Sequence, residues 1–171
     1  MLTVSLLRHA KSSWDDSSLD DYERSLNKRG EAAAPRMGAF MAQHGLAPDL
    51  VLCSSAVRAR QTLELVLPHL ADRPQVVYED GFYLAAPSAM LARLQKVDAK
   101  ARHVLIVGHD PGMQGLALEL AGDGDPALLQ ALCAKFPTAG LAVIRFKGRM
   151  WSKIAPGTGR LEMFATPKSL T

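Results

Sequence analysis

Four side chains of this sequence suit the binding of a phosphoryl group. Arg8 and His9 directly follow an apolar run near the N-terminus. Arg58 lies a few residues beyond a second apolar run, and His109 follows a third. Guanidinium groups bind phosphoryl oxygens in bidentate fashion, and an imidazole can attack phosphorus or donate hydrogen bonds to its oxygens. Two arginines and two histidines would form a site for a dianion if the fold brought them together.

The two histidines are expected to divide the chemistry between them. Positive charge nearby disfavours the protonated imidazole, so a histidine among arginines can stay neutral at pH 7 and act as a nucleophile. Attack by His9 on phosphorus would give a phosphoimidazole, which water then hydrolyses. His109 would donate hydrogen bonds to the equatorial oxygens in the transition state. This scheme requires no metal and no other cofactor.

The apolar runs predict the elements that position these side chains. Near-continuous aliphatic runs are typical of strands covered on both faces. These runs are residues 2–7, 50–53 and 104–107. Apolar residues at helical spacing occur in residues 33–41, 63–70, 90–97 and 113–120. The alternation predicts an α/β fold, a three-layer sandwich with a mainly parallel sheet and helices on both faces, whose ligands bind at the carboxyl ends of the strands.

Other segments predict additional strands, loops and one helix start. The further predicted strands are residues 75–79, 141–146, 150–154 and 160–164. Residues 141–146 and 150–154 are expected to pair as a hairpin. The polar segments 12–27 and 122–126 are expected to be loops. Asp110 is expected to cap the helix that follows it.

Length and charge bound the class of protein. A chain of 171 residues is long enough for one domain, residues 1–171, and can bury a core without disulfides. Its 20 lysines and arginines against 17 aspartates and glutamates give a net charge of +3. These charges are spread along the chain and form no basic arm of the kind that binds nucleic acid, so no nucleic-acid partner is expected.

No segment indicates export or a membrane. The N-terminal apolar run is too short for the core of a signal peptide, and no stretch approaches the ~18 apolar residues that cross a bilayer. Cys53 and Cys133 form no CxxC pair, so a thiolate zinc site is not expected and a reducing compartment fits. The chain is expected to be cytoplasmic.

Three segments that carry the candidate residues resemble the motifs of a known family. Residues 8–14 (RHAKSSW), 54–62 (SSAVRARQT) and 107–111 (VGHDP) resemble, in this order, the signatures of the histidine phosphatase superfamily. The short chain, with residues 26–30 (LNKRG) and 156–159 (PGTG), resembles the SixA-type phosphohistidine phosphatases within it. The resemblance implies a phosphoglycerate-mutase-like fold and a phosphatase that uses a phosphohistidine intermediate.

The resemblance also implies roles for single residues. His9 matches the histidine that accepts the phosphoryl group. Arg8, Arg58 and His109 match the rest of the phosphate pocket. Ser12 matches a position that often lines this pocket. No metal is implied.

The proton donor is less closely specified by the resemblance. Many members of the family use an acidic residue after the third strand, where this chain has Glu79 as the candidate. Asp80 and water stay open as alternatives, because a phosphoimidazole leaving group needs less help than an alkoxide. Ala10 stands where many members have glycine, and the added methyl group is expected to have a mild effect.

The length between two motifs indicates the size of the substrate. Only 51 positions separate Arg58 from His109, which leaves no room for the large lid of members that enclose small molecules. A shallow site favours phosphohistidine on a signalling protein, such as a histidine phosphotransfer domain. The alternatives are a low-specificity or sugar-phosphate phosphomonoesterase and a non-catalytic module that binds phosphoproteins.

A cysteine-based mechanism is the other alternative for a phosphatase. Cysteine phosphatases also place a cysteine at a strand end, with an arginine six positions later. Here the arginines follow Cys53 by five and seven positions, with no glycine-rich turn between. Cys53 is therefore expected to be a buried strand residue.

Overall fold

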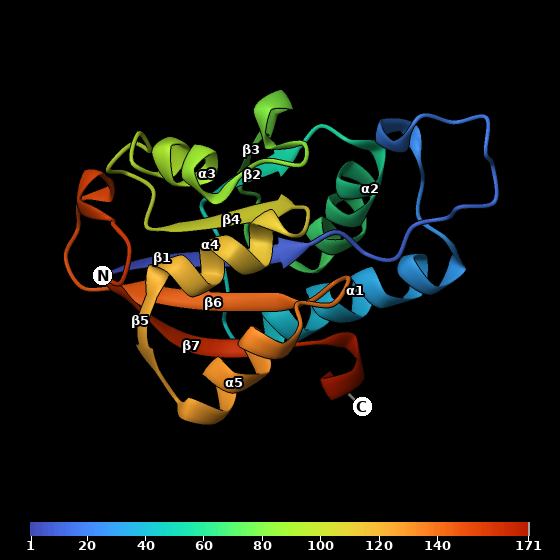
Figure 1. The fold of residues 1–171 in the computed structure, drawn as a ribbon. Coiled ribbons are helices and arrows are strands. Elements are labelled where there is room, and N and C mark those ends of the chain that lie inside the picture. Colours follow the sequence, from blue (N-terminus) through green and yellow to red (C-terminus); the bar gives the residue numbers. More distant parts are fainter. Residues whose placement is uncertain (171) are drawn as a thin grey trace.

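A computed structural model describes residues 1–170 of the chain. These residues form one seven-stranded sheet and five α-helices, joined in part by short 3₁₀ helices (Figure 1). The strands are β1 (Leu2–Arg8), β2 (Leu50–Ser54), β3 (Gln75–Glu79), β4 (His103–Gly108), β5 (Ala121–Gly124), β6 (Leu141–Phe146) and β7 (Gly159–Ala165). The α-helices are α1 (Lys28–Gln43), α2 (Val57–Val66), α3 (Pro87–Leu94), α4 (Gly112–Leu120) and α5 (Pro126–Ala134). The 3₁₀ helices are η1 (Asp21–Glu23), η2 (Leu67–His69), η3 (Asp80–Phe82), η4 (Trp151–Lys153) and η5 (Pro167–Leu170).

The sheet is mainly parallel, as the sequence predicts. Its strand order is β3-β2-β4-β1-β6-β7-β5. The first four strands in this order are parallel to one another. β6 runs antiparallel to both β1 and β7, and β5 is parallel to β7. Among the strands of residues 1–170, only β6 therefore runs against the rest.

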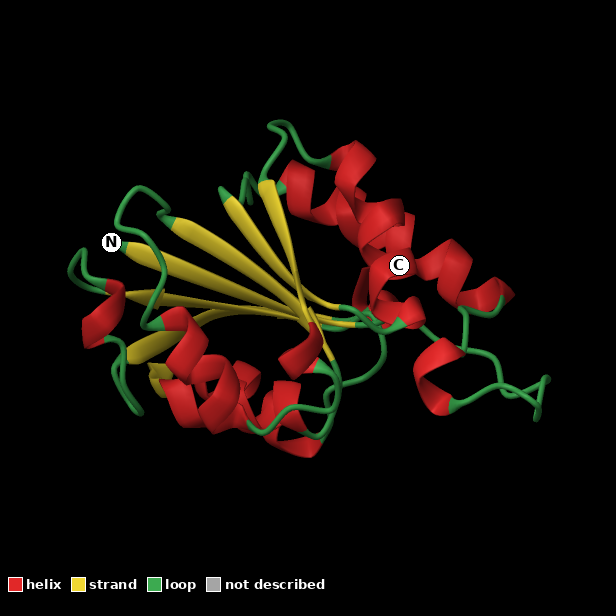
Figure 2. Cartoon of the chain, turned by 90° about the horizontal axis from the view of Figure 1, so that it is seen from above, coloured by secondary structure: helices red, strands yellow, loops and turns green. Residues whose placement is uncertain are grey.

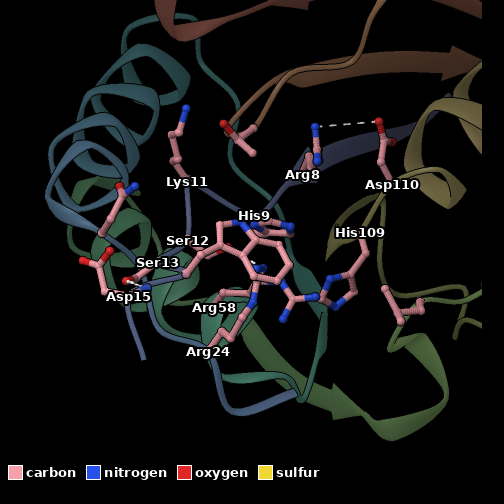
Figure 3. Close-up of a pocket in the computed structure, with 14 residues that line it drawn as sticks. Arg8, His9, Lys11, Ser12, Ser13, Asp15, Arg24, Arg58, His109 and Asp110 are labelled. Carbon is pink, nitrogen blue, oxygen red and sulfur yellow. Dashed lines mark hydrogen bonds and ion pairs between the residues drawn. The ribbon is translucent and has the colours of Figure 1, made fainter. Parts of the chain in front are cut away.

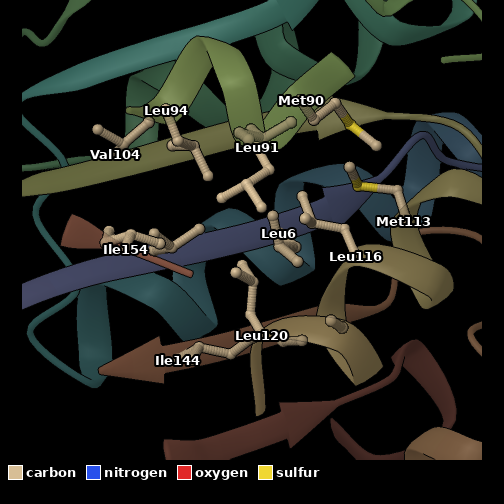
Figure 4. Packing of buried hydrophobic residues seen from close by; sticks show 14 of the residues in the cluster. Leu6, Met90, Leu91, Leu94, Val104, Met113, Leu116, Leu120, Ile144 and Ile154 are labelled. Carbon is tan, nitrogen blue, oxygen red and sulfur yellow. The ribbon is translucent and has the colours of Figure 1, made fainter. Parts of the chain in front are cut away.

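Helices cover both faces of the sheet, which confirms the three-layer sandwich (Figure 2). Successive strand side chains point to opposite faces, so a strand between two helical layers is apolar throughout. In β1, Leu6 joins the cluster beneath α3, α4 and α5 (Figure 4). The next residue, Leu7, joins the cluster beneath α1 and α2. None of the helices within residues 1–170 combines the length and apolar character needed to span a membrane.

The predicted hairpin strand at 150–154 is wrong. This segment contains η4 instead, and β6 pairs with β1 and β7. Trp151 and Ile154 are both buried, and a spacing of three places them on the same side of a 3₁₀ turn. The indole Nε1 of Trp151 donates to the carbonyl of Ala101 at 2.7 Å. Packing of the large Trp151 side chain therefore determines that this segment forms a 3₁₀ turn and not a strand.

The segment 122–126 also differs from its predicted loop. Much of it belongs to the edge strand β5, which pairs with β7 despite its poor strand propensity. The helix α5, which sequence reasoning did not find, begins at the last residue of this segment, Pro126. Asp125 caps this helix by accepting a hydrogen bond from the main-chain N–H of Ala127 at 2.8 Å. Tertiary pairing with β7 overrides the local preference here.

The start of α4 is shifted from the prediction by one residue. Pro111 occupies the N-cap position, and the helix begins at Gly112. Asp110 still accepts a hydrogen bond from the helix, from the N–H of Gln114 at 3.0 Å. A side chain at Gly112 would place a Cβ 2.2 Å from the carbonyl oxygen of Ala85, so this close approach requires glycine.

Candidate active site

The carboxyl ends of β1, β2 and β4 form one edge of the sheet, where the predicted site residues meet. In the parallel register, Arg8 lies opposite Gly108, so the residues that follow, His9 and His109, are neighbours. Their ring centroids are 5.3 Å apart. A cavity of about 440 Å³ opens here (Figure 3). Its lining includes Arg8, His9, Ser12, Arg24, Arg58 and His109.

Hydrogen bonding holds His9 in one tautomer. Nδ1 of this buried ring lies 2.7 Å from the carbonyl oxygen of Ala10. A carbonyl oxygen can only accept, so Nδ1 carries the proton and Nε2 keeps its lone pair. The main-chain N–H of Ala10 donates to Oγ1 of Thr62 at 2.9 Å, which fixes this turn to α2. The ring therefore presents an oriented lone pair.

His109 is oriented by the neighbouring strand. Its Nε2 lies 2.7 Å from the hydroxyl oxygen of Ser54, the last residue of β2. The ring of Tyr83 packs edge-on against it, with centroids 5.4 Å apart. Nδ1 of His109 is buried and has no hydrogen-bond partner within residues 1–170. This nitrogen is available to a ligand.

Both histidines are neutral at pH 7. Burial is the main cause that lowers the pKa of His9 to about 3; the hydrogen bond to Ala10 opposes it, and the charges of His109, Arg58 and Arg8 add to it. Burial, followed by the charge of Arg58, lowers the pKa of His109 to about 4. The neutral imidazole that the sequence predicts thus has two physical causes, burial and nearby positive charge, of which burial is the larger.

Arg58 is clamped by a residue that the sequence did not reveal. It lies in the first turn of α2 and is 3% exposed. Its Nη1 donates to the main-chain oxygen of Asp21 at 2.6 Å, and Nη2 donates to the Asp21 carboxylate at 2.9 Å. The hydroxyl of Tyr83 donates to the same carboxylate. Asp21 was hidden among several acidic residues of the polar segment 12–27.

The ionisation of Asp21 follows from these contacts. Burial raises the pKa of this carboxyl, but the hydrogen bonds from Tyr83 and Arg58 and the charges of Arg58 and Arg24 outweigh it and lower the pKa overall. Asp21 is therefore a carboxylate at pH 7. It holds Arg58 in position and partly balances the positive charge of the pocket.

Arg24 is a further pocket residue that sequence reasoning missed. Its guanidinium is buried and donates to the hydroxyl of Ser12 at 2.6 Å, so both side chains lie in the pocket. Its Cζ lies 3.3 Å from the ring centroid of Trp14, which is itself 75% exposed. The signal that could have found Arg24 is its position two residues before the LNKRG block.

That block joins the wall of the pocket to α1. The main-chain N–H of Asn27 donates to the carbonyl of Lys11 at 3.0 Å, and its side chain accepts from the N–H of Gly30 at 2.9 Å. A Cβ on Gly30 would lie 2.1 Å from the carbonyl oxygen of Lys11. Asparagine caps the helix and glycine permits the contact, which explains their spacing.

The structure does not bring Glu79 into the pocket. Its carboxylate accepts a hydrogen bond from Nε of Arg93 at 2.8 Å, in a half-buried ion pair. Asp80 begins η3. Neither residue is part of the cavity lining among residues 1–170. Of the predicted site residues, Arg8, His9, Ser12, Arg58 and His109 come together, and Glu79 stands apart.

The pocket is suited to an anion. Nε of Arg8, Nε of Arg58 and Nδ1 of His109 are buried nitrogens with no hydrogen-bond partner within residues 1–170. Arg8 is otherwise held by the carbonyl of Phe136 at 2.9 Å and faces the Asp110 carboxylate at 3.9 Å. Within the described part of the chain, no three His, Cys, Asp or Glu side chains are grouped to hold a metal ion. A tetrahedral oxyanion would supply the acceptors that these donors lack.

Comparison with known proteins agrees with this geometry. Residues 4–82 match the family model of the histidine phosphatase superfamily (branch 1). An uncharacterized protein of Mycobacterium tuberculosis is 36% identical over 164 residues, which cover 95% of this chain and all of that protein.

Two solved structures share the whole fold. A putative phosphohistidine phosphatase SixA from Agrobacterium tumefaciens is 32% identical, with a TM-score of 0.82 and coverage of 97% of this chain and 98% of that one. A putative phosphohistidine phosphatase SixA from Nakamurella is 30% identical, with a TM-score of 0.84 and coverage of 97% and 96%. The predicted phosphoglycerate-mutase-like fold is thereby confirmed. The chain belongs to the histidine phosphatase superfamily and is a phosphatase of the SixA type.

Proposed function

We propose that this chain removes the phosphoryl group from phosphohistidine on a protein, through an intermediate on His9. The observation that carries the proposal is the hydrogen bond from Nδ1 of His9 to the carbonyl of Ala10. It leaves the lone pair of Nε2 unprotonated in a pocket lined by arginines. A neutral and oriented imidazole is the nucleophile that attack on phosphorus needs.

In the first step, Nε2 of His9 attacks phosphorus, and the P–N bond to the substrate breaks. The electron pair of that bond goes to the departing nitrogen. A substrate ring that carries a proton on its other nitrogen leaves as neutral imidazole, so no acid on the enzyme is required. His9 keeps its Nδ1 proton, and the Ala10 carbonyl stabilises the positive charge that the phosphorylated ring acquires.

The remaining pocket residues stabilise the transferring group. The guanidiniums of Arg8 and Arg58 and an N–H of His109 are placed to bind the equatorial oxygens. In the second step, water attacks phosphorus and the bond to Nε2 of His9 breaks. Its electron pair returns to the ring, and the protons of the water stay on the phosphate that is released. Because protein side chains supply the positive charge, we expect activity to survive EDTA.

The mouth of the pocket favours a macromolecular substrate. Trp14 and Leu84 both line the cavity, and they are 75% and 54% exposed. Exposed apolar side chains beside a polar site are typical of contact with another protein. A phosphohistidine on a cytoplasmic signalling protein, such as a histidine phosphotransfer domain, fits this open mouth.

Two measurements test the proposal. We expect a higher kcat/KM for a phosphohistidine protein than for sugar phosphates, and faster turnover of the sugars would overturn the assignment of substrate. We also expect labelled phosphate to be trapped on His9 when the reaction is quenched in alkali and to be absent from His9→Ala. Tight binding of the phosphoprotein without release of phosphate would make the chain a binding module instead.

A further inference from the structure

A second cavity, which we call the basic groove, lies beside the pocket and is lined by five cationic residues. These are Lys11, Arg29, Arg36, Lys135 and Lys168. The cavity has a volume of about 710 Å³, larger than that of the pocket. Its cations come from the segment after β1, from α1, from the end of α5 and from η5.

Several cations of the basic groove are not balanced by a carboxylate of the described residues. Within residues 1–170, Lys11, Arg29 and Lys135 form no ion pair. Among the described residues, the partner of the Arg36 guanidinium is the carbonyl of Pro167, at 3.3 Å. No carboxylate is part of the lining in the described residues. Clustered like charges repel one another, so an anionic partner would stabilise this arrangement.

The basic groove is continuous with the pocket. Lys11 and Thr138 line both cavities, and Lys11 lies two residues after His9. In Figure 3, the side chain of Lys11 points away from the two histidines. A ligand whose phosphoryl group reaches His9 can therefore extend directly into the basic groove.

The dimensions and exposure indicate an extended partner. Arg29 and Arg36 are seven residues apart, which places them on the same side of α1 about 10 Å apart along its axis. That span exceeds a single phosphate group. All five cations are exposed, unlike Arg24 and Arg58 of the pocket, which are buried. No aromatic side chain lines the groove in the described residues, so it offers no platform for stacking nucleic-acid bases.

We propose that the basic groove binds an acidic segment of the phosphoprotein substrate, close to its phosphohistidine. The inference rests on the proposed function, because it assumes that the pocket accepts phosphohistidine from a protein. Glutamate and aspartate side chains along an extended segment match several exposed cations over this length. The groove would select among phosphoproteins, and the pocket would carry out the same reaction on each.

The test uses two phosphohistidine peptides that differ only in a run of glutamates or glutamines beside the phosphohistidine. At low salt, we expect kcat/KM for the acidic peptide to exceed that for the neutral peptide by about tenfold, as electrostatic steering allows. The variant Arg29→Glu/Arg36→Glu/Lys135→Glu should remove this preference. It should leave turnover of free phosphohistidine unchanged, which also shows that the variant is folded.

A matched control separates the groove from net charge. Lys147→Glu/Arg149→Glu/Lys153→Glu makes the same change of charge near the opposite edge of the sheet, where β6 ends beside Leu2. We expect this variant to keep the preference for the acidic peptide. Equal turnover of both peptides by the native chain, or an equal loss in the control variant, would overturn the proposal.

Binding without catalysis distinguishes failure of the groove from failure of the proposed function. Fluorescence anisotropy with the unphosphorylated acidic peptide should show binding that the groove variant loses and the control variant retains. Such binding together with no turnover of phosphohistidine would support the groove and reject the proposed function. Tighter binding of single-stranded RNA or of anionic vesicles than of the peptide would overturn the inference.

Discussion

The phosphoryl pocket and the basic groove both gather cations, but they hold them differently. In the pocket, Arg58 is almost fully buried and is clamped by Asp21, and Arg24 is buried against Ser12. In the groove, Arg29 and Lys135 are exposed and form no ion pair within residues 1–170. Rigid donors stabilise a charge that develops at one point, whereas flexible exposed ones attract a diffuse negative surface. Substitutions in the pocket should therefore lower turnover of every substrate, whereas substitutions in the groove should lower turnover of acidic substrates alone.

The largest expected effect is that of His9→Ala, which removes the proposed nucleophile. We expect turnover of every phosphorylated substrate to fall by at least about 10³-fold, as for the loss of other nucleophiles. Steady-state release of phosphate measures this. Cys53→Ser is the control, on β2 in the same sheet: burial raises the pKa of this thiol to about 12, so it is inert at pH 7 and activity should persist. The opposite result would reverse the assignment of the nucleophile.

Arg58→Ala should have the next largest effect. Loss of one buried donor to the transferring group is expected to lower kcat by about 10²- to 10³-fold. The loss should be similar for free phosphohistidine and for phosphohistidine proteins, because the pocket binds the group they share. The groove variants should affect only the acidic substrate. If Arg58→Ala lowered kcat only for protein substrates, Arg58 would serve in docking the protein, and the distinction between the pocket and the basic groove would be wrong.

Asp21→Asn should have an intermediate effect, because Asp21 acts through Arg58. The substitution keeps the shape of the side chain but removes the charge that holds the Arg58 guanidinium. We expect kcat/KM to fall about tenfold. The double variant with Arg58→Ala should be no worse than Arg58→Ala alone. Additive losses in this double-mutant cycle would show that Asp21 has a role separate from Arg58.

The pH dependence of stability should also separate the two regions. His9, with a pKa of about 3, and His109 and His103, each with a pKa of about 4, are neutral in the folded chain at pH values where the unfolded chain binds protons. The free energy of unfolding should therefore decrease as the pH falls from about 6.5 towards 4. Urea unfolding at several pH values measures this slope.

Substitutions sharpen this expectation. Arg58→Ala removes a positive neighbour of both pocket histidines and should make the slope shallower. The groove variant changes no group that faces the histidines and should leave the slope as it is. A free energy of unfolding that does not change with pH between 4 and 6.5 would contradict the burial of neutral histidines.

The smallest expected effect is that of Glu79→Gln. Because its carboxylate pairs with Arg93 and stands outside the pocket lining, we expect kcat to change by less than about twofold for phosphohistidine, within the range of a surface ion pair. A phosphate monoester should be tested beside it, since an alkoxide leaving group depends more on an acid. A large loss with either substrate would restore Glu79 as the proton donor.

Several features of the fold could be predicted from local patterns. The runs at β1, β2 and β4 are nearly continuous in apolar residues because both faces of these strands are covered, and this pattern is visible in the sequence. The strands at residues 75–79 and 160–164 were also predicted, although β3 is partly exposed and buried and exposed residues alternate along much of β7. Segments whose structure depends on distant partners were not: β5 exists because it pairs with β7, and η4 exists because Trp151 is buried.

By itself, the sequence determined which residues stand at the strand ends and, through its motifs, the family. Arg8, His9 and His109 stand where apolar runs end, Arg58 lies a few residues beyond such a run, and all four could be identified from the sequence. Only the tertiary structure decided how these groups are held and what surrounds them. Asp21 reaches Arg58 across 37 positions of the chain, and the basic groove is assembled from four separate segments. Strand ends are encoded in local hydrophobic patterns, whereas such contacts arise only when distant segments pack together, and no local pattern records them.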